Sequence, residues 1–157
     1  MHCEYLHRLF LHNDLAEGRF AAGGRPVALS DIRASIFAVG TVRDHVAPWR
    51  STYKIHLLTD AEVTYVLTTG GHNAGIVSEV GHKGRSCQVM TRPADGQHID
   101  PGGWQKAAPR KEGSWWPEWA AWLDQRSGAF IDAQWRDDAG GAAASLGPAP
   151  GTYVLQP

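Results

Sequence analysis

Cysteine is scarce in this sequence, since Cys3 and Cys87 are the only two among its 157 residues. Two cysteines outside any C-x-x-C pair exclude a disulfide-rich scaffold and a dithiol redox motif. We therefore expect both to be free thiols. The sequence also lacks G-x-S-x-G and its cysteine equivalent, the tight strand-to-helix turn that presents a nucleophile in hydrolase-like enzymes.

An excess of charge of either sign is also missing, because 15 Lys and Arg residues balance 16 Asp and Glu residues. This balance gives no basic surface for nucleic acid or for an anionic membrane. No run of about 18 apolar residues occurs, so we expect no membrane-spanning helix. The first residues lack the basic head and apolar core of a secretory signal, which favours a cytoplasmic location.

Metal-binding and phosphate-binding motifs are absent as well. The eight histidines form no H-E-x-x-H motif and no histidine–carboxylate cluster at ligand spacing. The glycines form neither a G-x-G-x-x-G nor a Walker pattern. The sequence therefore predicts no metal site and no bound cofactor.

The hydrophobic residues, 43% of the total, follow the pattern of an α/β domain. Apolar residues at helical spacing predict a helix over 3–11, and a Gly-Gly turn predicts a small hairpin within 19–29. Nearly continuous apolar runs at 36–40 and 63–68 predict strands buried on both faces. A helix over 48–58 would connect them, and strand–helix–strand order favours parallel pairing.

The second half of the chain is less regular. Residues 70–113 are rich in Gly, Pro and polar residues, with one short strand expected at 86–91. A helix is predicted from an N-cap at Ser114 to a stop at Gly128. The helical spacing of its tryptophans favours packing in the core over a sugar-binding or ligand-binding platform. Residues 137–151 have a linker composition, and 152–155 predict an extended segment.

Two polar residues follow the two predicted strands at the edge where parallel strands place active sites. Asp44 follows the first strand and His72 the second, in the acid-then-histidine order of an α/β-hydrolase triad. There, imidazole accepts the proton of a nucleophile, and the carboxylate orients the imidazole. The alternatives are a turn or cap role for Asp44 and a solvated His72. For His45, which is adjacent to Asp44, we expect a structural or hydrogen-bonding role.

The nucleophile of such a triad is not evident. Cys87 follows the histidine instead of preceding it, and Cys3 lies on the first predicted helix with no strand before it. An independent esterase that uses Cys87 is therefore a third and weaker reading.

Several segments resemble poly(3-hydroxyalkanoate) synthases, especially those of class I. Gly40–Trp49 is similar to the segment that holds their catalytic aspartate, and Thr69–Ile76 to the segment that holds their catalytic histidine. Further similar segments are Tyr5–Leu15, Gly24–Val27, Gly113–Leu123 and Ala149–Val154. The resemblance covers essentially the whole chain, and its motifs occur in the right order.

This resemblance implies the C-terminal quarter to third of an acyltransferase with an α/β-hydrolase fold. Such enzymes transfer 3-hydroxyacyl groups from coenzyme A to a growing polyester, through a cysteine that lies upstream of anything present here. Asp44 and His72 are the catalytic residues that carry over, and Asn13 and His45 are further substrate-binding candidates. The resemblance implies the end of a cap region with a hairpin at 1–34, part of the catalytic domain at 35–127 and a flexible tail at 128–157.

The implied partners are 3-hydroxyacyl-CoA, the polyester chain, and the remainder of a synthase or a second copy in a homodimer, with the polymer granule surface as a possible location. The alternative is a non-catalytic module that binds a full synthase or the granule. A missing neighbouring strand would expose backbone edge and apolar surface. We therefore expect the isolated chain to be marginally stable, to self-associate, or to need the rest of the enzyme.

Overall fold

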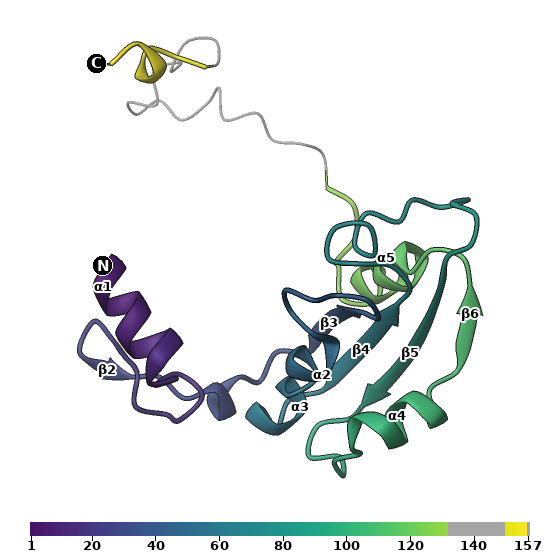
Figure 1. Ribbon diagram of the computed structural model, residues 1–157, viewed down its shortest axis with the longest axis horizontal. Coiled ribbons are helices and arrows are strands. Elements are labelled where there is room, and N and C mark those ends of the chain that lie inside the picture. The colour runs from purple at the N-terminus through teal and green to yellow at the C-terminus, as the bar shows by residue number, and fades with distance from the viewer. Residues whose placement is uncertain (132–149, 157) are drawn as a thin grey trace. The chain divides into compact units, whose positions relative to one another are not determined.

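The computed structural model describes residues 1–131 and 150–156, and the chain forms two compact units, Met1–Arg126 and Ser127–Pro157 (Figure 1). Helices and a mixed sheet make up the first unit, which confirms the α/β class. The boundaries expected at residues 34 and 127 stay predictions.

The N-terminal helix and hairpin are confirmed. Helix α1 (His2–Glu4) continues as a π-helical turn, η1 (Tyr5–Leu11). The helix ends where Asn13 adopts a φ of 51°, a left-handed conformation that asparagine tolerates better than most residues. Strands β1 (Ala21–Ala22) and β2 (Arg25–Pro26) then form an antiparallel hairpin.

An ion-pair cluster that the sequence did not reveal joins this helix to the hairpin. Asp14 is buried, and its carboxylate accepts hydrogen bonds from Arg8 Nε at 3.3 Å and Arg19 Nε at 3.0 Å. A short 3₁₀ turn, η2 (Leu29–Asp31), follows the hairpin.

The central sheet has the strand order β3-β4-β5-β6. Strands β3 (Ile36–Thr41) and β4 (Val63–Thr68) pair in parallel, as the two apolar runs predicted. Strand β5 (Ser86–Arg92) confirms the short strand expected there and pairs antiparallel with β4. Strand β6 (Arg110–Glu112) pairs antiparallel with β5 and was not predicted, because its three exposed charged residues carry no apolar signal.

The crossover between β3 and β4 contains two short helices, so the prediction of one helix over 48–58 is wrong. Helix α2 (Trp49–Thr52) and helix α3 (Ile55–Leu58) are separated by a turn. The Thr52 hydroxyl donates to the Trp49 carbonyl at 3.0 Å or to the Tyr65 hydroxyl at 2.7 Å. A β-branched residue that competes for backbone carbonyls in this way weakens a helix.

The sheet is covered on both faces, and the alternation of side chains along β4 explains how. Tyr65 and Leu67 point to the face covered by α2 and α4 (Pro101–Ala107), where Trp104 is buried. Val66 points to the other face, where it packs with Cys87 and Trp115. In this second cluster, Cys87 lies on β5, and Trp115 directly precedes α5 (Trp116–Asp124).

The region 93–113 is more regular than the sequence analysis indicated. Helix α4 begins where the Asp100 carboxylate accepts hydrogen bonds from the backbone N–H groups of Gly102 and Gly103, and Pro101 occupies the first turn. Asp followed by Pro is a recognised helix-start signal. The sequence alone therefore contained a signal that predicts this helix.

The tryptophan-rich helix is shorter than predicted. The N-cap of α5 is Trp115 and not Ser114 as predicted, although Ser114 Oγ accepts the N–H of Trp116 at 3.0 Å just before the helix. The helix ends at Asp124, four residues before Gly128. The core position expected for the tryptophans is confirmed for Trp115. It is wrong for Trp119, which is 44% exposed.

Two further expectations need correction. Strand β3 is only half-buried over most of its length, because β4 is its sole neighbour in the described sheet. Residues 153–155, expected to be extended, form a 3₁₀ turn, η4 (Tyr153–Leu155). Most of the expected linker, residues 137–149, lies outside the described residues. Among the described residues, no helix has the length and apolarity needed to cross a bilayer.

Candidate functional site

The parallel pairing of β3 and β4 places the two loops that follow these strands next to each other. Thr41 and Thr68 are the last register partners of the two strands. Beyond them, Val42 N–H donates to the Thr68 carbonyl and Arg43 N–H to the Gly70 carbonyl, both at 2.9 Å. Pairing therefore continues past the strands, up to the residue before Asp44.

Asp44 and His72 are in direct contact at this position. The Nδ1 atom of His72 lies 3.0 Å from Oδ2 and 3.2 Å from Oδ1 of Asp44. The Asp44 side chain is 8% exposed, whereas the His72 side chain is 47% exposed. The carboxylate is therefore shielded, while the ring is accessible from outside.

The backbone around Asp44 holds its carboxylate in the charged form. Oδ1 accepts hydrogen bonds from the N–H groups of Ala47 at 2.8 Å and Val46 at 2.9 Å. The bond from Ala47, followed by those from His72 and Val46, lowers the pKa of Asp44 and outweighs the opposing effect of burial. A charged carboxylate favours a proton on Nδ1 of His72, which leaves Nε2 as the acceptor nitrogen.

Glycines shape the loop that carries His72, residues 69–78, which we call the His72 loop. Gly70 has a φ of 119°, a conformation that residues with a Cβ rarely adopt. At Gly75, a Cβ would lie 2.5 Å from Cγ2 of Thr41. The His72 loop therefore rests directly on the end of β3, the strand that leads to Asp44.

Another glycine, Gly40, allows β3 and α2 to approach closely on either side of the connection that carries Asp44. A Cβ at Gly40 would collide with the hydroxyl of Tyr65 and lie 3.0 Å from Cβ of Trp49. The Tyr65 hydroxyl in turn donates to the Trp49 carbonyl at 3.0 Å. The start of α2 is thus fixed against the sheet, and the connection that contains Asp44 is short and constrained.

The other two candidate residues are not part of this contact. His45 is exposed, and no hydrogen bond joins it to Asp44 or His72. Asn13 is exposed at the end of the N-terminal helix and makes a backbone contact, its carbonyl accepting the Glu17 N–H at 3.1 Å. The substrate-binding roles expected for both stay predictions.

Neither cysteine is placed as a nucleophile for His72. Cys87 is 2% exposed and packs among apolar side chains on β5. Burial, together with Glu118, raises the pKa of its thiol, so the reactive thiolate is disfavoured. Cys3 is exposed on α1 and has no contact with the pair. Over residues 1–131 and 150–156, no group of three or more metal-ligating side chains occurs.

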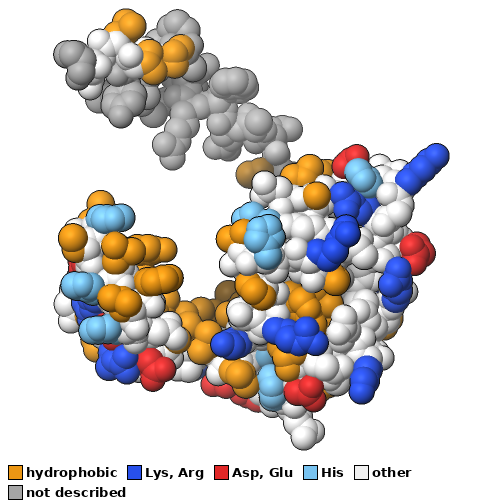
Figure 2. All heavy atoms as spheres, viewed as in Figure 1, with side chains coloured by type: hydrophobic (Ala, Val, Ile, Leu, Met, Phe, Trp, Pro, Cys, Tyr) orange, Lys and Arg blue, Asp and Glu red, His pale blue; other side chains and the backbone are white. Residues whose placement is uncertain are grey.

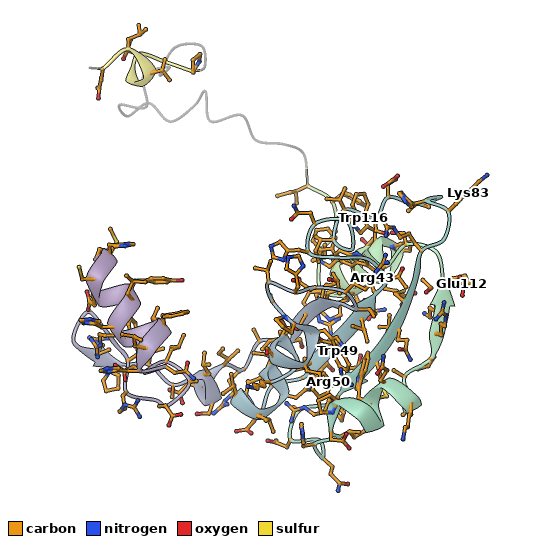
Figure 3. All side chains as sticks on the ribbon, viewed as in Figure 1. Arg43, Trp49, Arg50, Lys83, Glu112 and Trp116 are labelled. Carbon is orange, nitrogen blue, oxygen red and sulfur yellow. The ribbon has the colours of Figure 1, made fainter. Side chains whose placement is uncertain are left out.

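Sequence reasoning missed the segment that holds the His72 loop. The side chains of residues 114–116 donate hydrogen bonds to carbonyl groups of this loop. Figure 3 shows Trp116 and Arg43 toward the end of the sheet where β3 and β4 finish. The sequence signal for this segment is the adjacent pair Trp115 and Trp116, because an indole N–H that becomes buried needs an acceptor.

The chain as a whole carries no dominant charge, since 15 Lys and Arg residues balance 16 Asp and Glu residues. On the face shown in Figure 2, basic and acidic side chains are interspersed with hydrophobic and histidine side chains. This distribution agrees with the balanced composition of the sequence. It favours neither a polyanionic nor a polycationic partner.

No family model matches the chain. It is nevertheless similar along its length to curated poly(3-hydroxyalkanoate) polymerases. That of Methylorubrum extorquens is 37% identical over 153 residues, and the PhaC subunits of Rhizobium etli and Cupriavidus necator are each 32% identical over 156 and 161 residues. These matches cover 98% or 99% of this chain but only 23% to 25% of each relative.

This chain is related to the C-terminal portion of the poly(3-hydroxyalkanoate) polymerases. The resemblance inferred from the motifs is thereby confirmed. The chain spans about a quarter of the length of these polymerases.

Proposed function

We propose that this chain supplies the histidine and the aspartate of a Cys–His–Asp acyltransferase site. The rest of the site, including the cysteine, would come from polypeptide equivalent to the remaining three quarters of the polymerases. The sheet described here would then be the last part of an α/β-hydrolase fold. The relatives are named for the polymerisation of 3-hydroxyalkanoates. The reaction would transfer 3-hydroxyacyl groups to a growing polyester, with coenzyme A as the donor that the family resemblance implies.

The observation that carries the proposal is the contact between Asp44 and His72 at the carboxyl ends of two parallel strands. Catalytic groups of α/β proteins gather at this edge. The contact leaves Nε2 of His72 free to accept a proton, and the exposure of the ring lets another polypeptide reach it.

In the first half-reaction, Nε2 of His72 takes the proton of the cysteine thiol. The sulfur forms a bond to the carbonyl carbon of the acyl group while the bond from this carbon to the sulfur of coenzyme A breaks. The coenzyme A thiolate then takes the proton from Nε2. Asp44 stabilises the imidazolium that exists between these two proton transfers.

In the second half-reaction, a hydroxyl group attacks the enzyme-bound thioester and passes its proton by way of Nε2 to the cysteine sulfur that leaves. An ester bond forms, and the thiol is restored. The cycle returns every proton, because each proton that Nε2 accepts is delivered to the sulfur that leaves.

The experiment combines this chain with a polypeptide that covers the preceding part of the M. extorquens polymerase, and measures release of coenzyme A from 3-hydroxybutyryl-CoA. We expect release only from the mixture, and none when the chain carries His72→Gln. The matched control is His82→Gln, which removes a partly exposed histidine that pairs with a carboxylate outside the site. Equal turnover by the His72→Gln mixture would overturn the proposal.

A second candidate function is an interaction module without catalysis. The observation in its favour is that the two cysteines present are not placed to react with His72. Stable binding to the polymerase polypeptide with no coenzyme A release would select this function.

A further inference from the structure

Three consecutive residues each use a side chain to hold the His72 loop. We call these residues, 114–116, the clamp. The Trp115 ring donates through Nε1 at 3.1 Å, the Trp116 ring donates through Nε1 at 3.0 Å, and Ser114 donates through its hydroxyl. The acceptors are the carbonyl oxygens of Gly75, Ile76 and Ser78.

Short backbone turns connect these carbonyls to His72. The Gly75 N–H donates to the Gly71 carbonyl at 2.9 Å, which closes a turn around His72 itself. The Asn73 carbonyl accepts from the N–H groups of Ile76 at 3.1 Å and Val77 at 2.9 Å. A displacement of the Gly75 carbonyl therefore moves the backbone that carries His72.

The clamp is itself anchored to the sheet. Trp115 is 6% exposed, and its ring stacks with Phe37 of β3 at a centroid distance of 6.2 Å. The same ring packs with Val66 of β4 and Cys87 of β5. Because three strands fix this ring, its N–H group is a stationary reference point for the loop.

We infer that the clamp positions the His72 ring against Asp44, with Trp115 as the principal positioning residue. The contact between His72 and Asp44 is half-exposed on the histidine side, so the pair alone does not hold the loop in one conformation. The clamp supplies that restraint through its hydrogen bonds to the carbonyl groups of the loop. This inference deepens the proposed function and rests on it only for its effect on turnover.

The test compares Trp115→Phe with Trp122→Phe in the full chain. Both substitutions exchange a tryptophan that packs against Phe37, but the buried ring nitrogen of Trp122 has no hydrogen-bond partner, whereas that of Trp115 holds the loop. The histidine nitrogens are observed by ¹H–¹⁵N NMR, which reports the tautomer of His72 and the exchange of its Nδ1 proton with water.

For Trp115→Phe, we expect the Nδ1 proton of His72 to exchange about two- to tenfold faster, the factor that corresponds to the net loss of one hydrogen bond. Trp122→Phe should leave the exchange unchanged. Equal effects of the two variants, or no effect of Trp115→Phe on a folded chain, would refute the inference.

Trp116→Phe keeps the test decisive if Trp115→Phe does not fold, because Trp116 is only partly buried and its ring N–H holds the adjacent carbonyl. It should also accelerate exchange at His72. Turnover by the mixture with the polymerase polypeptide is measured separately. If the NMR effect occurs and no variant or parent chain supports turnover, the proposed function fails and the clamp stands.

Discussion

Protonation of a buried histidine should make the stability of this chain depend strongly on pH. His56 is 4% exposed, and neither of its ring nitrogens has a hydrogen-bond partner. Its ring lies 4.4 Å from that of Tyr53, measured between centroids. Burial, followed by the charges of Arg92 and His98, lowers the pKa of His56 from 6.5 to about 4.

The direction of the effect follows from where the proton binds. Between pH 6.5 and about 4, the unfolded chain binds a proton at this histidine and the folded chain does not. The free energy of unfolding therefore falls as the pH is lowered through this range. Above pH 6.5, the contribution of the neutral histidine to stability is fully present. At about 1.4 kcal/mol for each pH unit, the loss of stability is about 3–4 kcal/mol. That is a large share of the roughly 5–15 kcal/mol that stabilises a typical domain.

The perturbation is His56→Phe, which keeps a planar ring and removes both unpaired nitrogens. A cavity of about 100 Å³, lined in part by His56, Tyr53 and Trp104, gives the larger ring room. We expect an increase in stability of about 1–3 kcal/mol at pH 7, from removal of unsatisfied buried polar atoms. The variant should also lose less stability than the parent chain between pH 6.5 and 4.

The assay is urea unfolding, monitored by tryptophan fluorescence, at several pH values between 4 and 7.5. His45→Phe is the control, since it removes an exposed histidine and should leave the pH dependence of the parent chain intact. The reasoning is refuted if His56→Phe and the parent chain lose the same free energy of unfolding over this range.

Three further predictions concern the site and its surroundings. Asp44→Asn should lower turnover by the mixture about 10⁴-fold, the loss seen in Ser–His–Asp enzymes, because an amide that donates to His72 favours the wrong tautomer. Gly75→Ala should destabilise the chain by about 1–3 kcal/mol, measured by urea unfolding, because its Cβ would overlap Thr41. In the native chain, a thiol reagent should modify Cys3 quickly and Cys87 only after unfolding, because the Cys87 thiol is buried and its pKa raised.

Each of these has a matched comparison. Glu79→Gln alters another carboxylate–histidine pair at 2.8 Å and should leave turnover unchanged. Gly71→Ala places a Cβ in the same loop with only one contact, at 3.7 Å from the Arg43 carbonyl, and should be tolerated. The first prediction is wrong if Asp44→Asn and Glu79→Gln give equal turnover. The second is wrong if the two glycine variants are equally stable, and the third if both thiols are modified rapidly.

The site could be predicted because it depends on a simple topological rule. Two apolar runs separated by a helical segment predict parallel strands, and parallel strands bring the residues that follow them to one edge. The contact between Asp44 and His72 follows from this rule, and their catalytic roles stay a prediction. The hydrogen bonds that fix the Asp44 carboxylate come from the local turn at Val46 and Ala47.

The features that escaped prediction depend on contacts between distant residues. The bond from Trp115 to Gly75 spans 40 residues, and no periodicity in either segment indicates it. Strand β6 consists of exposed charged residues, so only its pairing with β5 defines it as a strand. Just before the break between α2 and α3, the hydroxyl of Tyr65 on β4 contacts Thr52 Oγ1 and the Trp49 carbonyl, and neither contact is visible from the sequence.

The free edge of β3 links the fold to the proposed function. Strand β4 is buried along its whole length, whereas Ile36–Val39 on β3 are only half-buried and lack a second neighbouring strand among the described residues. An edge with apolar side chains pairs readily with another chain. We therefore expect the chain on its own to self-associate in sedimentation experiments, and Ile36→Lys, at a partly exposed edge position, to reduce this association. The edge strand leads directly into the loop that carries Asp44. A strand that paired in parallel with β3 would therefore end close to His72. The same variant should then also weaken assembly with the polymerase polypeptide. A monodisperse monomer that unfolds in one sharp transition would show that this edge needs no partner.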